Sequence, residues 1–184
     1  MKEIFIPEQE LYNDSTAEFI QIKNTTLQLE HSLISLKKWE QKWHKPFLKK
    51  EDKTVEEIVD YIQCMTLNGK SVDPIVYKYL PTNAIEEVTE YIKDPMSATW
   101  FSDNSLMGAQ KNPNEIVTAE IIYYWMISLN IPVEFEKWHL NQLLTLIKVV
   151  SIKNSPKKKM PRREAAQQRA ALNAARRAKY NSKG

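Results

Sequence analysis

Residues 29–43 read LEHSLISLKKWEQKW, and the spacing of their apolar side chains decides the fold class. Apolar residues recur at steps of four, three, three and four, at Leu29, Leu33, Leu36, Trp39 and Trp43. This spacing places them along one face of an α-helix, with lysine and glutamate on the other faces. A proline follows three residues later and cannot continue the helix. The stretch therefore predicts an amphipathic helix that buries one side against the rest of the protein.

Further helix signals follow along the chain. Thr54 and Glu57 form a capping-box pattern, which is typical of a helix start, and Asn83 and Glu86 repeat it. The hydrophobic spacing also predicts helices over residues 74–79, 115–129 and 140–150. The body of the chain, residues 1–152, is thus expected to be mainly α, a compact bundle of about six short helices.

Two short runs near the N-terminus are typical of β-strands. Residues 2–7 (KEIFIP) and 18–23 (EFIQIK) are rich in β-branched and aromatic side chains. In the second run Ile20 and Ile22 alternate with polar residues, as in a strand with one buried face. We expect the two runs to pair as a hairpin within residues 2–25.

Composition limits the class of protein. One cysteine, Cys64, excludes an internal disulfide and fits a reducing compartment. The longest apolar run, residues 121–127, is far shorter than the ~20 residues that span a bilayer. The N-terminus lacks the charge and apolar pattern of a secretory signal. The presence of only three glycines argues against glycine-rich phosphate-binding loops. A soluble, intracellular, mainly helical protein is expected.

Charge divides the chain into two parts. Residues 153–184 contain 11 lysines and arginines and a single acid, Glu164, so their formal charge is +10. The whole chain carries +3, which leaves −7 on residues 1–152. Because the C-terminal part has almost no large aliphatic side chains, it cannot build a core of its own. An acidic body is therefore joined to a basic C-terminal arm.

The arm has the composition of a helix. Residues 162–179 hold seven alanines and neither glycine nor proline. Arg162, Arg169 and Arg176 are seven residues apart, so they fall along one helical stripe. Such a helix is marginal alone in water and is expected to become ordered on an acidic partner. The candidate contact residues of the arm are Lys157, Lys158, Lys159, Arg162, Arg163, Arg169, Arg176 and Arg177.

Three roles for the arm are consistent with this pattern. It can be a solubilising tail that folds back on the acidic body or on a neighbouring subunit. It can bind nucleic acid without sequence specificity, because clustered basic residues release counterions from phosphates. Stacking on bases is not expected, since Tyr180 is the one aromatic residue among the basic ones. The third role is to contact an acidic protein partner.

No pattern in the sequence predicts catalysis, a metal or a cofactor. The three histidines and Cys64 lack the spacing of a zinc site. His31 is interpreted as a structural histidine, and His139 as one held by Glu134 or Glu136. Glu120 lies in the most apolar predicted helix, where burial would raise its pKa. A structural role for Glu120, paired with His139 or Lys137, is the favoured interpretation. The tryptophans are interpreted as core or interface anchors, and the candidates for partner contact are Trp39, Trp43 and Trp100.

Several stretches of the amino-acid sequence resemble those of a known group of proteins. They are LQLEHSLISLKKWEQKWHKPFL (27–48), KTVEEIVDYIQCMTL (53–67), DPMSATWF (94–101), IVTAEIIYYWMISLNIPVEFEKWHLNQLLTLIKV (116–149) and ALNAARRAKYNS (171–182). Together they resemble small proteins encoded next to the tape-measure gene of long-tailed bacteriophages, which are assigned as tail assembly chaperones. The resemblance covers most of the chain from about residue 18, and it implies no catalytic residues.

The resemblance implies a protein that works in the host cytoplasm and is absent from the mature virion. Such a protein binds the long helical tape-measure protein and keeps it soluble while tail-tube subunits polymerise around it. The arm would add a salt-sensitive contact to the tape measure or to the major tail-tube protein, and the body could form a homo-oligomer. The alternatives are a structural virion protein, such as a tail or head–tail connector component, and a nucleic-acid-binding accessory protein.

Overall fold

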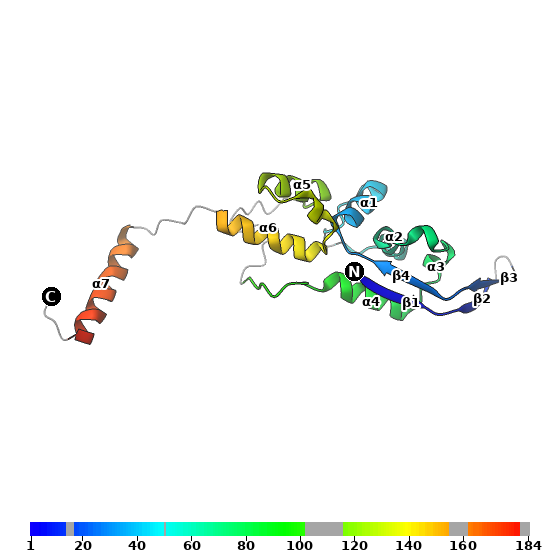
Figure 1. Cartoon of the computed structure of the whole chain (residues 1–184), viewed down its shortest axis with the longest axis horizontal. Helices are drawn as coiled ribbons and strands as arrows, with labels where there is room; N and C mark the ends of the chain where they lie inside the picture. Colours follow the sequence, from blue (N-terminus) through cyan, green and yellow to red (C-terminus); the bar gives the residue numbers. More distant parts are fainter. Residues whose placement is uncertain (14–16, 50, 102–115, 155–161, 181–184) are drawn as a thin grey trace. The chain divides into compact units, whose positions relative to one another are not determined.

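The structure is a computed structural model, and it is mainly helical with small β elements, as predicted (Figure 1). The chain divides into two compact units, Met1–Lys153 and Asn154–Gly184. The residues that the structure describes are 1–13, 17–49, 51–101, 116–154 and 162–180.

The N-terminal strands pair differently from the prediction. Strand β1 (Lys2–Ile6) pairs antiparallel with β4 (Thr25–Leu29), and β2 (Gln9–Asn13) pairs antiparallel with β3 (Glu18–Ile22). The expected pairing of the first run with residues 18–23 is therefore wrong, and the paired region extends past residue 25. We call these four strands the ribbon.

One register runs through both halves of the ribbon. In every facing pair, from Lys2 with Leu29 to Asn13 with Glu18, the two residue numbers add up to 31. The two strand pairs therefore form one long, interrupted hairpin. The interruption falls at Pro7, which has no N–H to donate to a ladder. Beside it, the Glu8 N–H donates to the side chain of Asn24 at 2.8 Å instead of to a backbone carbonyl.

Helix α1 (Leu33–Trp43) starts later than the predicted stripe. Ser32 caps it in a capping box with Ser35, and Leu29 belongs to β4. Leu29 fits both a helical step of four and a strand alternation with Leu27, so spacing alone could not assign it. Hydrogen bonds to other segments decide the case, because the backbone flanking Leu29 bonds across to residues 65–67.

The remaining elements of the first unit follow in short steps. Helix α2 (Val55–Met65) begins with the predicted Thr54–Glu57 capping box. Helix α3 (Ile75–Lys78) leads into α4 (Thr82–Lys93), which starts after Pro81 without a side-chain cap, so the Asn83–Glu86 capping prediction is wrong. The others are η1 (Gly69–Ser71), α5 (Ala119–Ser128), η2 (Val133–Lys137) and α6 (Leu140–Asn154). In the second unit, α7 spans Arg162–Tyr180.

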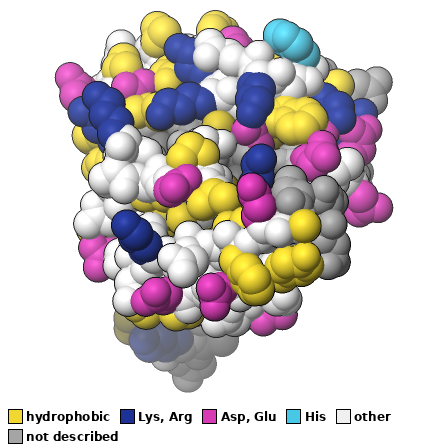
Figure 2. Space-filling model, turned by 90° about the vertical axis from the view of Figure 1, so that its right-hand side faces the viewer, with side chains coloured by type: hydrophobic (Ala, Val, Ile, Leu, Met, Phe, Trp, Pro, Cys, Tyr) yellow, Lys and Arg dark blue, Asp and Glu magenta, His cyan; other side chains and the backbone are white. Residues whose placement is uncertain are grey.

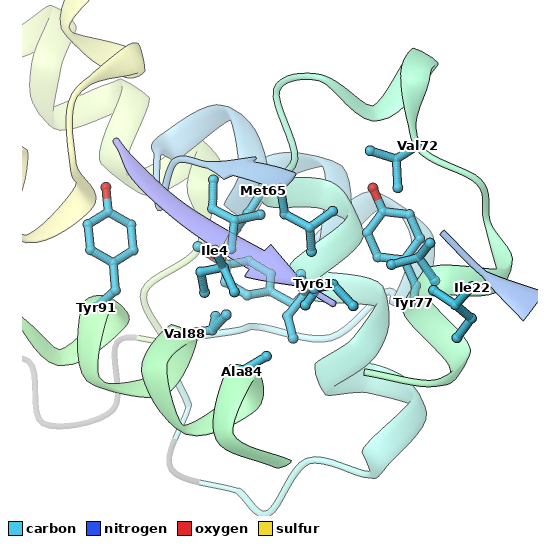
Figure 3. Packing of buried hydrophobic residues seen from close by; sticks show 14 of the residues in the cluster. Ile4, Ile22, Tyr61, Met65, Val72, Tyr77, Ala84, Val88 and Tyr91 are labelled. Carbon is cyan, nitrogen blue, oxygen red and sulfur yellow. The ribbon is translucent and has the colours of Figure 1, made fainter. Parts of the chain in front are cut away.

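Two clusters of buried side chains form the core of the first unit. The first lies under the ribbon and is completed by α2, α3 and α4. In Figure 3, Ala84 and Val88 on α4 point toward Ile4 on β1 and Tyr61 on α2. The second cluster joins α1, α5 and α6. Helix α1 serves both clusters, because Trp39 packs in the first while Leu33 and Leu36 pack in the second.

Candidate partner-binding surfaces

An apolar groove of about 460 Å³ lies between α2 and α4. Isoleucine, valine and aromatic side chains form most of its lining, and three charged residues stand at the end where the chain enters α2. The lining residues are Phe47, Glu51, Asp52, Lys53, Ile58, Tyr61, Ile62, Ile85, Val88, Thr89 and Ile92. A concave apolar surface with a few polar groups suits a side chain from another helix.

Stacked rings make one wall of this groove rigid. The rings of Phe47 and Tyr61 stack with centroids 3.9 Å apart, and the Lys53 ammonium lies 4.7 Å from the Phe47 centroid. The Phe47 ring also meets the ring of Trp39 edge-on, with centroids 5.1 Å apart. Phe47 is thus held by contacts with Tyr61, Trp39 and Lys53, so a partner would meet a preformed surface at this wall.

Behind this wall, two buried histidines link the two core clusters. His31 Nδ1 lies 2.6 Å from the Tyr61 hydroxyl, and its ring meets that of His139 at 5.0 Å. His139 Nε2 donates to the backbone carbonyl of Tyr91 at 3.1 Å. The backbone follows the same route, since the Leu140 N–H donates to the His31 carbonyl at 2.6 Å.

Burial disfavours the charged form of both rings by lowering their pKa values. It lowers the pKa of His31 to about 3, with a further contribution from His139. It also lowers the pKa of His139, against a weaker opposing effect of the Tyr91 carbonyl. The structural role predicted for His31 agrees with these contacts. The predicted partners of His139, Glu134 or Glu136, are wrong, because its Nε2 donates to the Tyr91 carbonyl and its Nδ1 accepts the Asn141 N–H at 3.3 Å. Glu136 instead accepts a hydrogen bond from the Tyr123 hydroxyl at 2.6 Å.

A buried carboxylate on α1 caps a helix that is distant in sequence. The two oxygens of Glu40 accept the N–H groups of Phe47 at 2.8 Å and of Ala119 at 2.7 Å. Ala119 is the first residue of α5, and Thr118 before it makes no side-chain cap. Burial raises the pKa of Glu40 even though both hydrogen bonds act to lower it. Sequence spacing holds no signal for this long-range cap.

Glu120, the acid expected to be buried, is exposed. Helix α5 buries Ala119, Ile122, Trp125 and Met126, and this stripe leaves Glu120 on the outside. The prediction failed because tyrosine and isoleucine also occupy the exposed side of α5, so the helix looks apolar all round in the sequence. The expected pairing of Glu120 with His139 is therefore wrong as well.

The three candidate tryptophans differ in exposure. Trp39 is 1% exposed, and its Nε1 donates to the Glu57 carbonyl at 2.9 Å, so it is a core residue and not a contact surface. Trp43 is half-buried and its Nε1 donates to Asp60 at 2.9 Å. Trp100 is 84% exposed. Of the three, Trp100 alone presents most of its ring to a partner.

The basic residues of the arm are described only in part. Arg169, Arg176 and Arg177 lie on α7 with exposed side chains. Arg162 and Arg163 begin the same helix, but their side chains are outside the described part of the chain. The cluster of Lys157, Lys158 and Lys159 also lies outside the described residues.

Exposed aromatic side chains on the ribbon were not found from the sequence. Phe5, Tyr12 and Phe19 are all more than half exposed, and the rings of Tyr12 and Phe19 contact each other across the strands with centroids 5.1 Å apart. The available signal in β2 was the alternation of the exposed Tyr12 with the partly buried Leu11. Figure 2 shows a face on which hydrophobic side chains lie among side chains of both charges.

Comparison with known proteins identified no relative. No protein-family model, curated protein or solved structure matches the chain. Among the described residues, no group of three histidine, cysteine, aspartate or glutamate side chains is placed to hold a metal ion. Within that same part of the chain, no helix has the length and apolar character needed to cross a membrane.

Proposed function

We propose that the protein is a tail assembly chaperone of a long-tailed bacteriophage, which binds the tape-measure protein without catalysing a reaction. The observation that carries the proposal is the preformed apolar groove between α2 and α4, lined by Ile58, Ile85 and Ile92. A tape-measure protein exposes apolar helical stripes before the tail tube covers them. A groove between two helices accepts side chains at helical spacing, so it can shield such a stripe from water.

The resemblance noted in the sequence supports the same function, and it assigns the protein to the host cytoplasm during assembly. In this proposal Trp100 adds an exposed anchor, and the arm adds a salt-sensitive contact to the tape measure or the major tail-tube protein. Chaperoning needs no cofactor.

Co-expression with the tape-measure protein tests the groove. A charge in the groove, Thr89→Glu, should reduce capture of the tape-measure protein by at least about tenfold, which corresponds to about 1.4 kcal/mol. The matched control is Thr82→Glu, which adds the same charge at an exposed position on the same helix. Both variants should keep the helical circular dichroism and thermal transition of the unmodified protein.

Three results would reject the chaperone role. The tape-measure protein could remain insoluble with the unmodified chain, or both threonine variants could capture it equally well, which would reject the groove that carries the proposal. Purified virions could contain this chain in stoichiometric amounts, which would make it a structural component. Retention of the full chain on DNA at ~150 mM salt, with no capture of the tape measure, would favour a nucleic-acid-binding role.

A further inference from the structure

The two long edges of the ribbon differ beside the N-terminus. The outer edge of β4 is closed, because the Leu67 N–H donates to the Gln28 carbonyl at 2.7 Å and the Gln28 N–H donates to the Asn68 side chain at 3.0 Å. The same Asn68 side chain donates to the Thr26 carbonyl at 2.8 Å. On the opposite side, β1 has no further strand within the described part of the chain. The edge of β1 is therefore the side on which another strand can be added.

The register identifies the backbone groups at this edge. Glu3 faces Gln28 and Phe5 faces Thr26 in the ladder. Because Gln28 and Thr26 direct their backbone groups away from β1, Glu3 and Phe5 direct theirs away from β4. Pro7 ends the row, since it has no N–H to donate. The N–H and C=O groups of Glu3 and Phe5 are thus placed to pair with an added strand.

The side chains of the same two residues lie on the outward face of the ribbon. Glu3 is exposed and Phe5 is 61% exposed, whereas Ile4 between them points into the first core cluster (Figure 3). Gln28 Nε2 donates to Glu3 Oε1 at 3.0 Å and holds the carboxylate on this face. Residues of an added strand that stand directly opposite Glu3 and Phe5 place their side chains about 5 Å from these two. A carboxylate and an aromatic ring therefore select the sequence of that strand.

The same chemistry continues along β2. Glu10 is exposed and Tyr12 is 54% exposed, while Leu11 between them packs against the core. Residues 1–30 hold six acids and two lysines, so their formal charge is −4. Arginine suits this surface, because its guanidinium binds carboxylates through paired hydrogen bonds and stacks on aromatic rings. A nucleic acid would be repelled by it.

We propose that an extended, arginine-containing segment of a partner protein binds the edge of β1 by strand addition. Its main chain bonds to Glu3 and Phe5, and an arginine stands opposite Glu3. In this mode the main-chain hydrogen bonds supply affinity, and alternate side chains supply specificity. No residue of this edge lines the groove between α2 and α4. A loss of binding at the edge therefore leaves the capture of the tape-measure protein unchanged.

A labelled hexapeptide that alternates arginine with valine is the probe. Its binding to the full chain is followed by fluorescence anisotropy at one salt concentration. A version with glutamate in place of arginine should bind at least about tenfold more weakly, because it meets the acidic face. A version with methylated backbone nitrogens should lose as much, because it cannot donate to the Glu3 and Phe5 carbonyls. No binding of the probe, or equal binding of the three peptides, would overturn the proposal.

Two substitutions at one position test the backbone contact. Phe5→Ala and Phe5→Pro both remove the ring, but only proline also removes the N–H that faces the open edge. Phe5→Pro should therefore bind the probe at least about tenfold more weakly than Phe5→Ala, and equal affinities would overturn the proposal. Circular dichroism establishes that each variant is folded. Should Phe5→Pro fail to fold, the methylated peptide decides, because it tests the same edge on the unmodified chain.

Charge and location are tested separately. Glu3→Arg should weaken binding of the probe by at least about tenfold, whereas Glu134→Arg, at an exposed glutamate on η2, should leave it unchanged. Equal losses in the two variants would overturn the proposal, because they would show attraction by net charge alone. In the unmodified chain, the probe should slow amide hydrogen exchange at Glu3 and Phe5. Slowing that is confined to other residues would place the peptide elsewhere and would also overturn it.

Discussion

Acid should destabilise the protein through His31. The side chain is 2% exposed, and burial together with the nearby ring of His139 lowers its pKa from 6.5 to about 3. The unfolded chain therefore gains a proton at His31 as the pH falls through about 6.5, while the folded protein excludes it. Stability is thus lost as the pH falls from about 6.5 toward 3, and it is retained above that range.

The pKa values set the size of this effect. A pH of 5 lies about 1.5 units below the ordinary histidine pKa of the unfolded chain, and each unit corresponds to about 1.4 kcal/mol of unfolding free energy. The unfolding free energy should therefore be about 2 kcal/mol lower at pH 5 than at pH 7 because of His31 alone. His139 acts in the same direction, since burial lowers its pKa as well.

Urea unfolding followed by tryptophan fluorescence at both pH values measures the effect. In His31→Asn an amide takes the place of Nδ1 beside the Tyr61 hydroxyl, and the titrating ring is gone. The loss between pH 7 and pH 5 should be about 2 kcal/mol smaller in this variant, because carboxylates that titrate in both proteins cancel. The matched control is His44→Asn, at an exposed left-handed position that asparagine tolerates.

Equal pH dependence in the unmodified protein and in His31→Asn would refute this reasoning. It would mean that the buried ring accepts a proton as readily as an exposed one. The same conclusion would follow if His44→Asn and His31→Asn removed the pH dependence to the same extent.

Three further perturbations have expected results. Glu40→Gln places an amide donor against one of the two backbone N–H groups that Glu40 accepts, so the free energy of unfolding in urea should fall by about 2 kcal/mol. The control Glu120→Gln, at an exposed position, should change it by less than about 0.5 kcal/mol. Trp39→Phe removes a buried donor and should cost about 1–3 kcal/mol in the same assay, whereas Trp100→Phe should be neutral. Burial, with a smaller effect of a nearby aspartate, raises the pKa of Cys64 to about 11. Iodoacetamide at pH 8 should therefore alkylate Cys64 much more slowly in the folded protein than in the protein unfolded by urea. Rapid alkylation of the native protein would contradict that pKa.

Local signals predicted most helices correctly. The Thr54–Glu57 capping box starts α2 as expected, because the hydrogen bonds that define it are made within four residues. The helical character of α5 was also clear, although its start was not. That helix begins at Ala119 where Glu40 caps it, and a cap supplied from 79 residues away leaves no local pattern.

The strands show where local patterns are insufficient. Leu27 and Leu29 alternate as a strand does, yet Leu29 also stands one helical step before Leu33. Only segments that are distant in sequence distinguish the two cases, because β4 pairs with β1 and the backbone beside Leu29 bonds to residues 65–67. The pairing of Lys2–Ile6 with this strand could not be inferred from either segment alone.

The sequence by itself determined the helical class, the acidic body and the basic arm, because these depend on residue type and spacing along the chain. The tertiary structure decided which polar groups are buried, which was not visible in the sequence. It buried Glu40 and exposed Glu120, and it brought His31 and His139 together. The physical reason is that burial depends on neighbours supplied by distant segments, while helix propensity and net charge belong to the segment itself.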